Sequence, residues 1–208
     1  MRCPWKAFRM FPTSDKYYFK TLYYLPEAAL QEKRFKDLYG EWRRQGHITI
    51  TPGNVTDYDY ILNDIMSIRE IVFIQKIAYY SWNSTQFVIN AEEKGLPMEP
   101  YGQNLGNFNR PTKEMERLIL SGKAVIDNNV INRHCFRNVV MARDRNGNTK
   151  PSKQFEEKKI DGVIAKLEAN VPEDVHVFLN QTTVVPESVV YPLIGQDRNL
   201  VFTINGER

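Results

Sequence analysis

The spacing of apolar residues along the chain changes repeatedly from the two-residue period of strands to the helical period. Residues 74–80 form a short β-prone run, and residues 85–94 place Phe87, Val88 and Ala91 on one face of a helix. A second short strand is predicted over residues 98–101. A short helix between two strands favours a crossover between parallel neighbours, so we expect an α/β fold.

The N-terminal part alternates in the same way. Two aromatic-rich runs, residues 5–11 and 17–25, are separated by turn residues and predict a β-hairpin. Residues 26–45 indicate a helical stretch with an interruption possible at Gly40, and residues 47–51 a strand.

The rest of the first 169 residues continues the alternation of helices and strands. We expect helices after residue 57, from Pro111 or Thr112, after Asn128/Asn129 and over 155–169, and strands over 124–126 and 139–142. A turn at Asn146-Gly147 leads into a basic loop. After residue 169 the helical periodicity stops, so the 208 residues predict one domain over 1–169 and a strand-rich or irregular appendage over 170–208.

The positive charge is concentrated in one region. The chain has 28 Lys and Arg against 25 Asp and Glu. Between residues 143 and 159 six basic residues stand against three acids, and these six are Arg143, Arg145, Lys150, Lys153, Lys158 and Lys159. Such a region is either a basic binding surface or a solvated loop.

Composition excludes several other classes of protein. Two cysteines, Cys3 and Cys135, are too few for a disulfide framework or a four-cysteine zinc site, and they fit a reducing cytosolic compartment. The N-terminus lacks the apolar region of a signal peptide. Because no apolar run approaches the roughly 20 residues that a bilayer requires, we expect no membrane-spanning segment.

Several stretches, taken in order and spacing, resemble the C-terminal nuclease half of the large terminase subunit of tailed phages over residues 8–169. They include Trp42-Arg43-Arg44-Gln45-Gly46, Thr51-Pro52-Gly53-Asn54-Val55, Ile77-Ala78-Tyr79 with Trp82-Asn83, Pro111-Thr112-Lys113-Glu114-Met115-Glu116-Arg117, Gly147-Asn148-Thr149-Lys150-Pro151 and Lys159-Ile160-Asp161-Gly162-Val163. The resemblance implies an RNase H-like mixed sheet flanked by helices. It also implies Mg²⁺- or Mn²⁺-dependent cleavage of double-stranded DNA during genome packaging in the cytoplasm of the bacterial host. The implied partners are the terminase motor domain, the small terminase subunit and the portal.

In that family three acids from three elements hold the metal, and hard ions such as Mg²⁺ prefer oxygen ligands of this kind. The resemblance places the third acid at Asp161, which would otherwise be an exposed helix aspartate. The second falls on Tyr80, a neutral phenol. The first belongs to a strand that should precede the hairpin, yet little sequence stands before Trp5. We therefore expect this strand to be missing. The sheet should then show a gap, a rearrangement or a foreign strand between the hairpin and residues 74–80, a strand we place near the middle. No Gly-rich loop of the motor half occurs either.

Other acids and soft ligands have structural explanations. Asp57 and Asp59 lie at a helix start, and Asp127 precedes a helix as a cap would. Glu114 and Glu116 fit the exposed side of a helix. The pair His134-Cys135 is better explained by packing than by metal binding.

Two functions of different classes remain open at this level. One is a terminase nuclease domain that cleaves DNA. The other is an inactive remnant, or a DNA-binding or assembly module of the same fold. A junction resolvase is a weaker third, because the runs around residues 52–54 and 111–123 resemble terminases.

Overall fold

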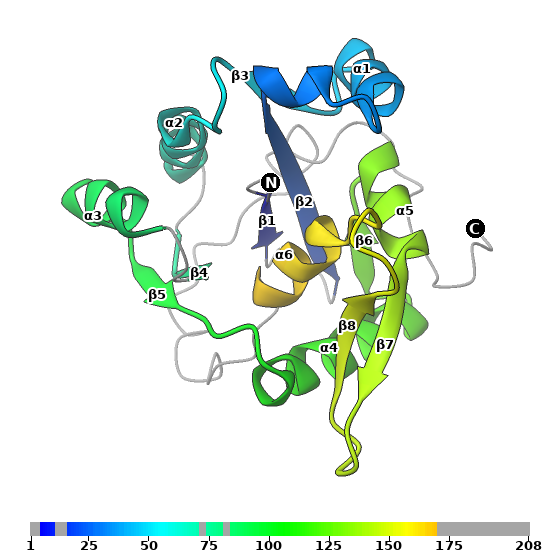
Figure 1. The fold of residues 1–208 in the computed structure, drawn as a ribbon. Helices are drawn as coiled ribbons and strands as arrows, with labels where there is room; N and C mark the ends of the chain where they lie inside the picture. The colour runs from blue at the N-terminus through cyan, green and yellow to red at the C-terminus, as the bar shows by residue number, and fades with distance from the viewer. Residues whose placement is uncertain (1–4, 11–15, 71–73, 81–83, 170–208) are drawn as a thin grey trace.

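The computed structural model describes residues 5–10, 16–70, 74–80 and 84–169. The proposed appendage over 170–208 lies outside them. In this part of the chain the elements alternate between strands and helices, as the apolar pattern predicts (Figure 1). None of the helices described is both long and apolar enough to cross a bilayer.

Strand β2 (Tyr17–Pro26) is the centre of the largest sheet. It pairs antiparallel with β1 (Trp5–Met10), which confirms the predicted hairpin. Its first residues pair in parallel with β6 (Ala124–Ile126) and its last with β3 (Thr49–Thr51). Side chains on both faces of β2 are buried, Phe19 on one face and Tyr24 on the other, because helices cover the sheet.

The predicted strand–helix–strand unit is confirmed, but its place in the sheet is not. Strand β4 (Ile77–Tyr79), helix α3 (Thr85–Glu93) and strand β5 (Met98–Pro100) form a parallel pair with a crossover helix. Gly95, with φ 71°, follows the end of the helix. The prediction that β4 lies near the middle of the sheet is wrong, because β4 pairs only with β5 in a separate two-stranded sheet among the strands described.

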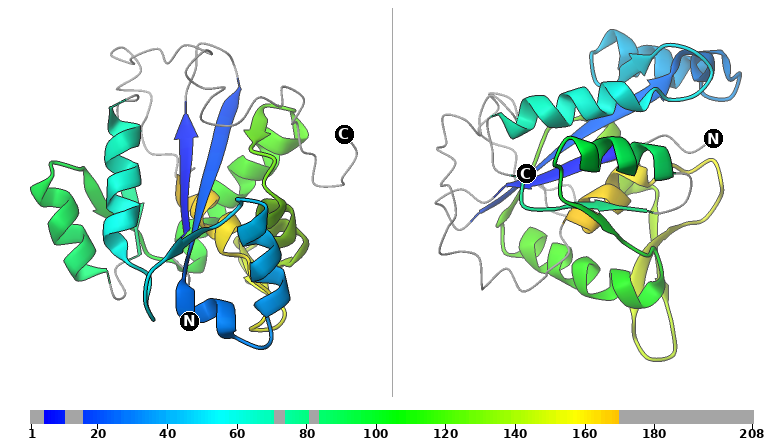
Figure 2. Two further views of the ribbon diagram at one scale, coloured as in Figure 1. Left: turned by 90° about the horizontal axis from the view of Figure 1, so that it is seen from above. Right: turned by 90° about the vertical axis from the view of Figure 1, so that its left-hand side faces the viewer.

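A gap separates the two sheets. In Figures 1 and 2, β1 lies between β2 and the β4–β5 pair. Among the described strands only β2 pairs with β1, which leaves the edge of β1 facing β4 without a strand. The predicted gap is therefore confirmed for this part of the chain.

The helices on the N-terminal side differ from the prediction in one place. The stretch predicted over 26–45 is a 3-10 helix (Glu27–Gln31) followed by α1 (Lys36–Arg44). The interruption therefore lies before α1 and not at Gly40, which is inside α1. Helix α2 (Tyr58–Arg69) begins where expected, with the Asp57 carboxylate accepting a 2.9 Å hydrogen bond from the Asp59 N–H.

Helix α4 (Leu105–Leu120) begins earlier than predicted. The Asn104 side chain caps it by accepting a 2.8 Å hydrogen bond from the Asn107 N–H, and Pro111 lies within the helix. Proline has no N–H for the carbonyl four residues before it. Here that carbonyl, on Asn107, accepts a 2.6 Å hydrogen bond from the Tyr101 hydroxyl instead. Tyr101 thus supplies the donor that Pro111 lacks.

The last third of the domain corrects two predictions. Helix α5 (Val130–Arg137) is followed by β7 (Val139–Arg143) and β8 (Thr149–Lys153), which pair antiparallel. The predicted basic loop therefore contains the second strand of a hairpin. Helix α6 (Asp161–Ala169) begins later than the predicted residue 155. It packs across β1 and also contacts β2 and β4.

Candidate functional site

Asp161 is the first residue of α6, and it is half-buried. The helix lies unusually close to β2 at the next position, since a Cβ atom on Gly162 would lie 2.2 Å from the Tyr23 hydroxyl oxygen. Only glycine allows this approach. The first turn is closed by the N–H groups of Val163 and Ile164, which both donate to the Ile160 carbonyl at 2.9 and 3.1 Å. The helix predicted over residues 155–169 would place Asp161 in its interior, and that placement is wrong.

Tyr80 follows directly after β4, at the carboxyl end of that strand, and is half-buried. Its carbonyl accepts a 3.0 Å hydrogen bond from the Ser84 hydroxyl. Because α6 contacts β4, the structure brings the helix of Asp161 against the strand that leads to Tyr80. Both elements border the gap beside β1.

The residues in this region do not fit the two-ion site that the resemblance implies. Within the described ranges, no three His, Cys, Asp or Glu side chains converge as a metal site requires. Asp161 offers one carboxylate, and the phenol of Tyr80 is a poor ligand for a hard ion. A single carboxylate leaves such an ion coordinated mostly by water.

A buried polar network lies on the other side of α6, between that helix, β2 and α5. Its cation is Lys166, whose side chain is 0% exposed. The Lys166 ammonium donates to the Thr21 hydroxyl at 2.5 Å, to the Asn132 amide oxygen at 2.6 Å and to the Gly162 carbonyl at 3.3 Å. Three acceptors match the three N–H bonds of an ammonium.

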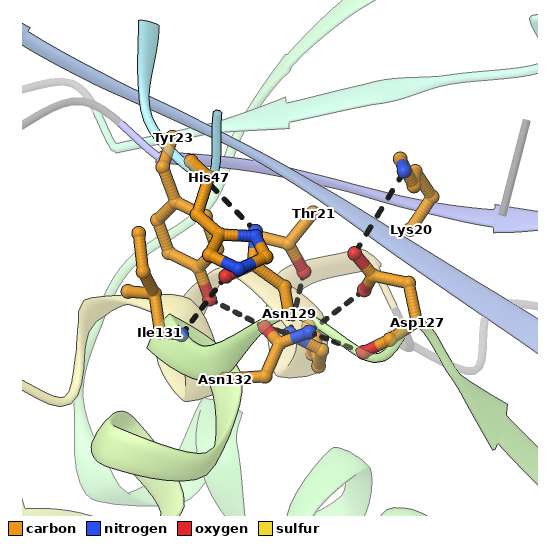
Figure 3. Close-up of polar contacts among 9 residues, drawn as sticks. Lys20, Thr21, Tyr23, His47, Asp127, Asn129, Ile131 and Asn132 are labelled. Atoms are coloured by element: carbon orange, nitrogen blue, oxygen red, sulfur yellow. Dashed lines mark hydrogen bonds and ion pairs between the residues drawn. The ribbon is translucent and has the colours of Figure 1, made fainter. Parts of the chain in front are cut away.

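The matching anion is Asp127, which is 4% exposed. The Asn132 side-chain NH₂ donates to its carboxylate at 2.8 Å, and Tyr23 donates to the Asn132 oxygen at 2.5 Å (Figure 3). Lys20 lies 3.9 Å from the other carboxylate oxygen. The Asn132 amide therefore bridges a buried anion and a buried cation. The cap predicted at Asp127 is wrong, because Asn129 caps α5 and accepts from the Ile131 N–H at 2.8 Å.

Burial shifts the acid–base behaviour of this network. Desolvation raises the pKa of the Asp127 carboxyl, and the nearby charges of Lys166 and Lys20 oppose that shift. Desolvation lowers the pKa of Lys166 to about 8, with Asp127 opposing it. Sequence inspection missed this network, and the one available signal was a lysine three residues after Val163 on the apolar side of its helix.

The six predicted basic residues divide between two places. The β7–β8 hairpin carries four, of which Arg143, Arg145 and Lys153 are exposed and Lys150 is half-buried. Lys150 donates to the Gln103 carbonyl at 3.2 Å, and Lys153 donates to the Glu156 carbonyl at 3.0 Å.

The other two basic residues lie beside α1 and α5. The Lys159 ammonium is 5.5 Å from the centre of the Phe35 ring, and Lys158 is exposed. His134 packs edge-on against Trp42, and its pKa is lowered by burial first and then by Lys158 and Arg137. The prediction that His134-Cys135 serves packing is supported, because Cys135 is buried in the core.

A sheet with parallel and antiparallel pairs and with helices packed against it makes this a mixed α/β protein. The likeness to a solved terminase structure, given below, assigns this architecture to the RNase H-like fold. Comparison with known proteins agrees. Residues 5–171 match the family model of the terminase large subunit endonuclease domain. The chain therefore belongs to the terminase large subunit nuclease family.

Two curated relatives and one solved structure show how far the similarity extends. The terminase large subunit of Enterobacteria phage HK97 is 29% identical over 147 residues, which are 69% of this chain and 29% of that protein. Protein YmfN of Escherichia coli (strain K12) is 30% identical over 142 residues, 67% of this chain and 31% of that protein. The crystal structure of the HK97 large terminase superposes with a TM-score of 0.66 at 23% identity, over 82% of this chain and 39% of that one. The chain thus spans about three tenths of the curated relatives' length.

Proposed function

We propose that this chain acts on double-stranded DNA as the nuclease part of a phage terminase large subunit during genome packaging. The family supports the substrate and the setting, which is the cytoplasm of the infected bacterium. It also supports a motor domain, a small terminase subunit and the portal as partners. The basic residues of the β7–β8 hairpin and of residues 158–159 are the proposed DNA contacts, because phosphate contacts need mainly positive charge.

The single observation that carries the catalytic part of the proposal is the position of Asp161. It begins the helix that packs across β1 and contacts β4, and Tyr80 follows directly after β4 on the far side of that gap. Hydrolysis of a phosphodiester by this class of nuclease is metal-dependent, and the described residues supply too few ligands for it. Cleavage is therefore proposed to need a carboxylate from an added strand in the gap and a second at position 80.

Plasmid nicking with Mn²⁺ tests this proposal. The chain as given is expected to nick little or not at all. Tyr80→Asp should improve Mn²⁺ binding measurably but restore little cleavage. Tyr80→Asp together with an N-terminal strand that carries an Asp should cleave, and Asp161→Ala should abolish that activity. Robust nicking by the unmodified chain that survives Asp161→Ala would place the active site elsewhere.

A second function is favoured by the phenol at position 80. An inactive member of the family that binds DNA or assembles with other packaging proteins would keep the fold and lose the acids. The Tyr80→Asp variant with the added N-terminal strand distinguishes this function from DNA cleavage. If that variant binds DNA and Mn²⁺ but does not cleave, the binding or assembly role is the better conclusion.

A further inference from the structure

The buried network beneath α6 has a consequence for the proposed nuclease site. Lys166 contacts no solvent, and burying a charged ammonium is costly unless its hydrogen bonds are satisfied. Its three acceptors come from three different elements, namely β2, α5 and the first turn of α6 itself. A lysine that only filled volume would not need this arrangement.

One of the three acceptors is directly beside the candidate metal ligand. The Lys166 ammonium donates to the carbonyl of Gly162, and Gly162 follows Asp161 in the first turn of α6. The same turn is in close contact with β2 through the Tyr23 hydroxyl. The ammonium therefore ties the turn that carries Asp161 to β2 through Thr21 and to α5 through Asn132.

We propose that Lys166 is a positioning residue, which fixes the first turn of α6 and so sets the place of Asp161 at the edge of the gap. The importance of Asp161 for catalysis rests on the proposed function, whereas the fixing of the first turn of α6 by Lys166 does not. Lys166 acts through Gly162 and does not itself contact substrate. The Asp127 carboxylate balances the charge of the ammonium, and the Asn132 amide accepts its hydrogen bond.

Lys166→Met tests the proposal, because methionine has similar length and no N–H donor. Hydrogen exchange of the Val163 and Ile164 amides reports opening of the first turn, since both donate to the Ile160 carbonyl. Their exchange should become about tenfold faster, while the Val88 amide in α3 should be unchanged. Lys113→Met, at an exposed lysine in α4, is the matched control and should leave all three amides unchanged.

A second pair of variants keeps the test decisive if Lys166→Met does not fold. Thr21→Val removes one acceptor at nearly constant shape, and Thr21→Ser keeps it. Thr21→Val should accelerate exchange at Val163 and Ile164, and Thr21→Ser should behave as the unmodified chain. Unchanged exchange in Thr21→Val and Lys166→Met, or equal acceleration at Val88, would show a role in general stability and overturn the proposal.

A metal measurement separates this inference from the proposed function. In the Tyr80→Asp variant, adding Lys166→Met should weaken Mn²⁺ binding by about tenfold, as expected when the support of a ligand is lost. Undiminished Mn²⁺ affinity would overturn the positioning role. If Tyr80→Asp alone binds no Mn²⁺, the proposed metal site fails, and the exchange experiment still decides whether Lys166 fixes the turn.

Discussion

At the scale of single residues, the buried Lys166 makes stability depend on pH in the alkaline range. Its pKa falls from an ordinary 10.5 to about 8 on folding, so between these values the unfolded chain binds more protons. Stability therefore rises with pH in that window. The slope for one proton is about 1.4 kcal/mol per pH unit, which gives roughly 1 kcal/mol between pH 8 and 9.

Neighbouring groups reverse this trend at higher pH. Burial raises the pKa of Cys135 from 9.0 to about 11, and it raises the pKa of Tyr23 well above 10.0. For both groups the folded chain keeps a proton that the unfolded chain loses, so stability falls. From about pH 9, the gain in stability from Lys166 and the loss from Cys135 cancel. Above about pH 10, the loss of stability from Tyr23 dominates.

We predict a thermal midpoint that rises from pH 8 to 9, stays level to pH 10 and then falls. Lys166→Met should remove the rise and begin to fall at pH 9. Thermal unfolding followed by circular dichroism across pH 7–10.5 measures both profiles. A flat profile for the unmodified chain between pH 8 and 9 would contradict the buried charge.

A second prediction concerns the proline inside α4. Tyr101→Phe removes the donor to the Asn107 carbonyl and should cost about 1 kcal/mol of unfolding free energy. In a Pro111→Ala background the same change should cost less, because alanine at that position supplies the N–H that proline lacks. Chemical denaturation of the four proteins in this double-mutant cycle measures the coupling. Equal costs in both backgrounds would show that the two residues are independent.

At the scale of elements, the contact between α6 and β2 predicts a severe effect from a small side chain. Gly162→Ala places a methyl group 2.2 Å from the Tyr23 hydroxyl oxygen, and this overpacking should cost about 1–3 kcal/mol. That exceeds the gain in helix propensity of up to about 1 kcal/mol. Tyr23→Phe should recover part of the loss, since the remaining ring atoms lie 3.1 Å away. Urea denaturation of the three variants is the measurement, and a stabilised Gly162→Ala protein would contradict the packing.

The β7–β8 hairpin predicts how the chain binds DNA. Replacing Lys150 and Lys153 by Ala should weaken binding to duplex DNA and lower its salt dependence. Both side chains also donate to backbone carbonyls, so replacing the exposed Arg143 and Arg145 should have at least as large an effect. Fluorescence anisotropy from about 50 to 200 mM salt measures the slope. A slope unaffected by either pair of changes would mean that the hairpin is merely solvated.

Local signals were enough to predict most elements. The Asp57 cap, Gly95 at a helix end and the aromatic runs of the hairpin each act over a few residues. The start of α4 was missed because proline is disfavoured inside a helix, and the donor that replaces its missing N–H is a side chain outside the helix, Tyr101. Strand β8 was missed because its sequence, Thr149 to Lys153, is polar and contains Pro151, although Thr149 and Pro151 are buried.

The site was predictable only in part, because some of its contacts join residues that are far apart in the sequence. The roles of Asp161 and position 80 were predicted from the resemblance to a family, because such a resemblance assigns roles to positions in the sequence. The network of Lys166, Asn132 and Asp127 joins two helices and the end of a strand. Apart from the position of Lys166 on the apolar side of its helix, no local pattern distinguishes the buried lysine and aspartate from the exposed ones that usually occupy helices and caps.

At the scale of the whole molecule, the order of synthesis from the N-terminus decides when the strands of the largest sheet can pair. Tyr17 in β2 pairs with Ala124 in β6, about 100 residues later along the chain. The β1–β2 and β7–β8 hairpins, by contrast, close locally. At ribosomal rates of about 5–20 residues per second, β6 emerges roughly 5–20 s after β2. During translation the part of the apolar core around Phe19 that β6 completes therefore stays open for seconds, a period in which exposed apolar surface favours aggregation.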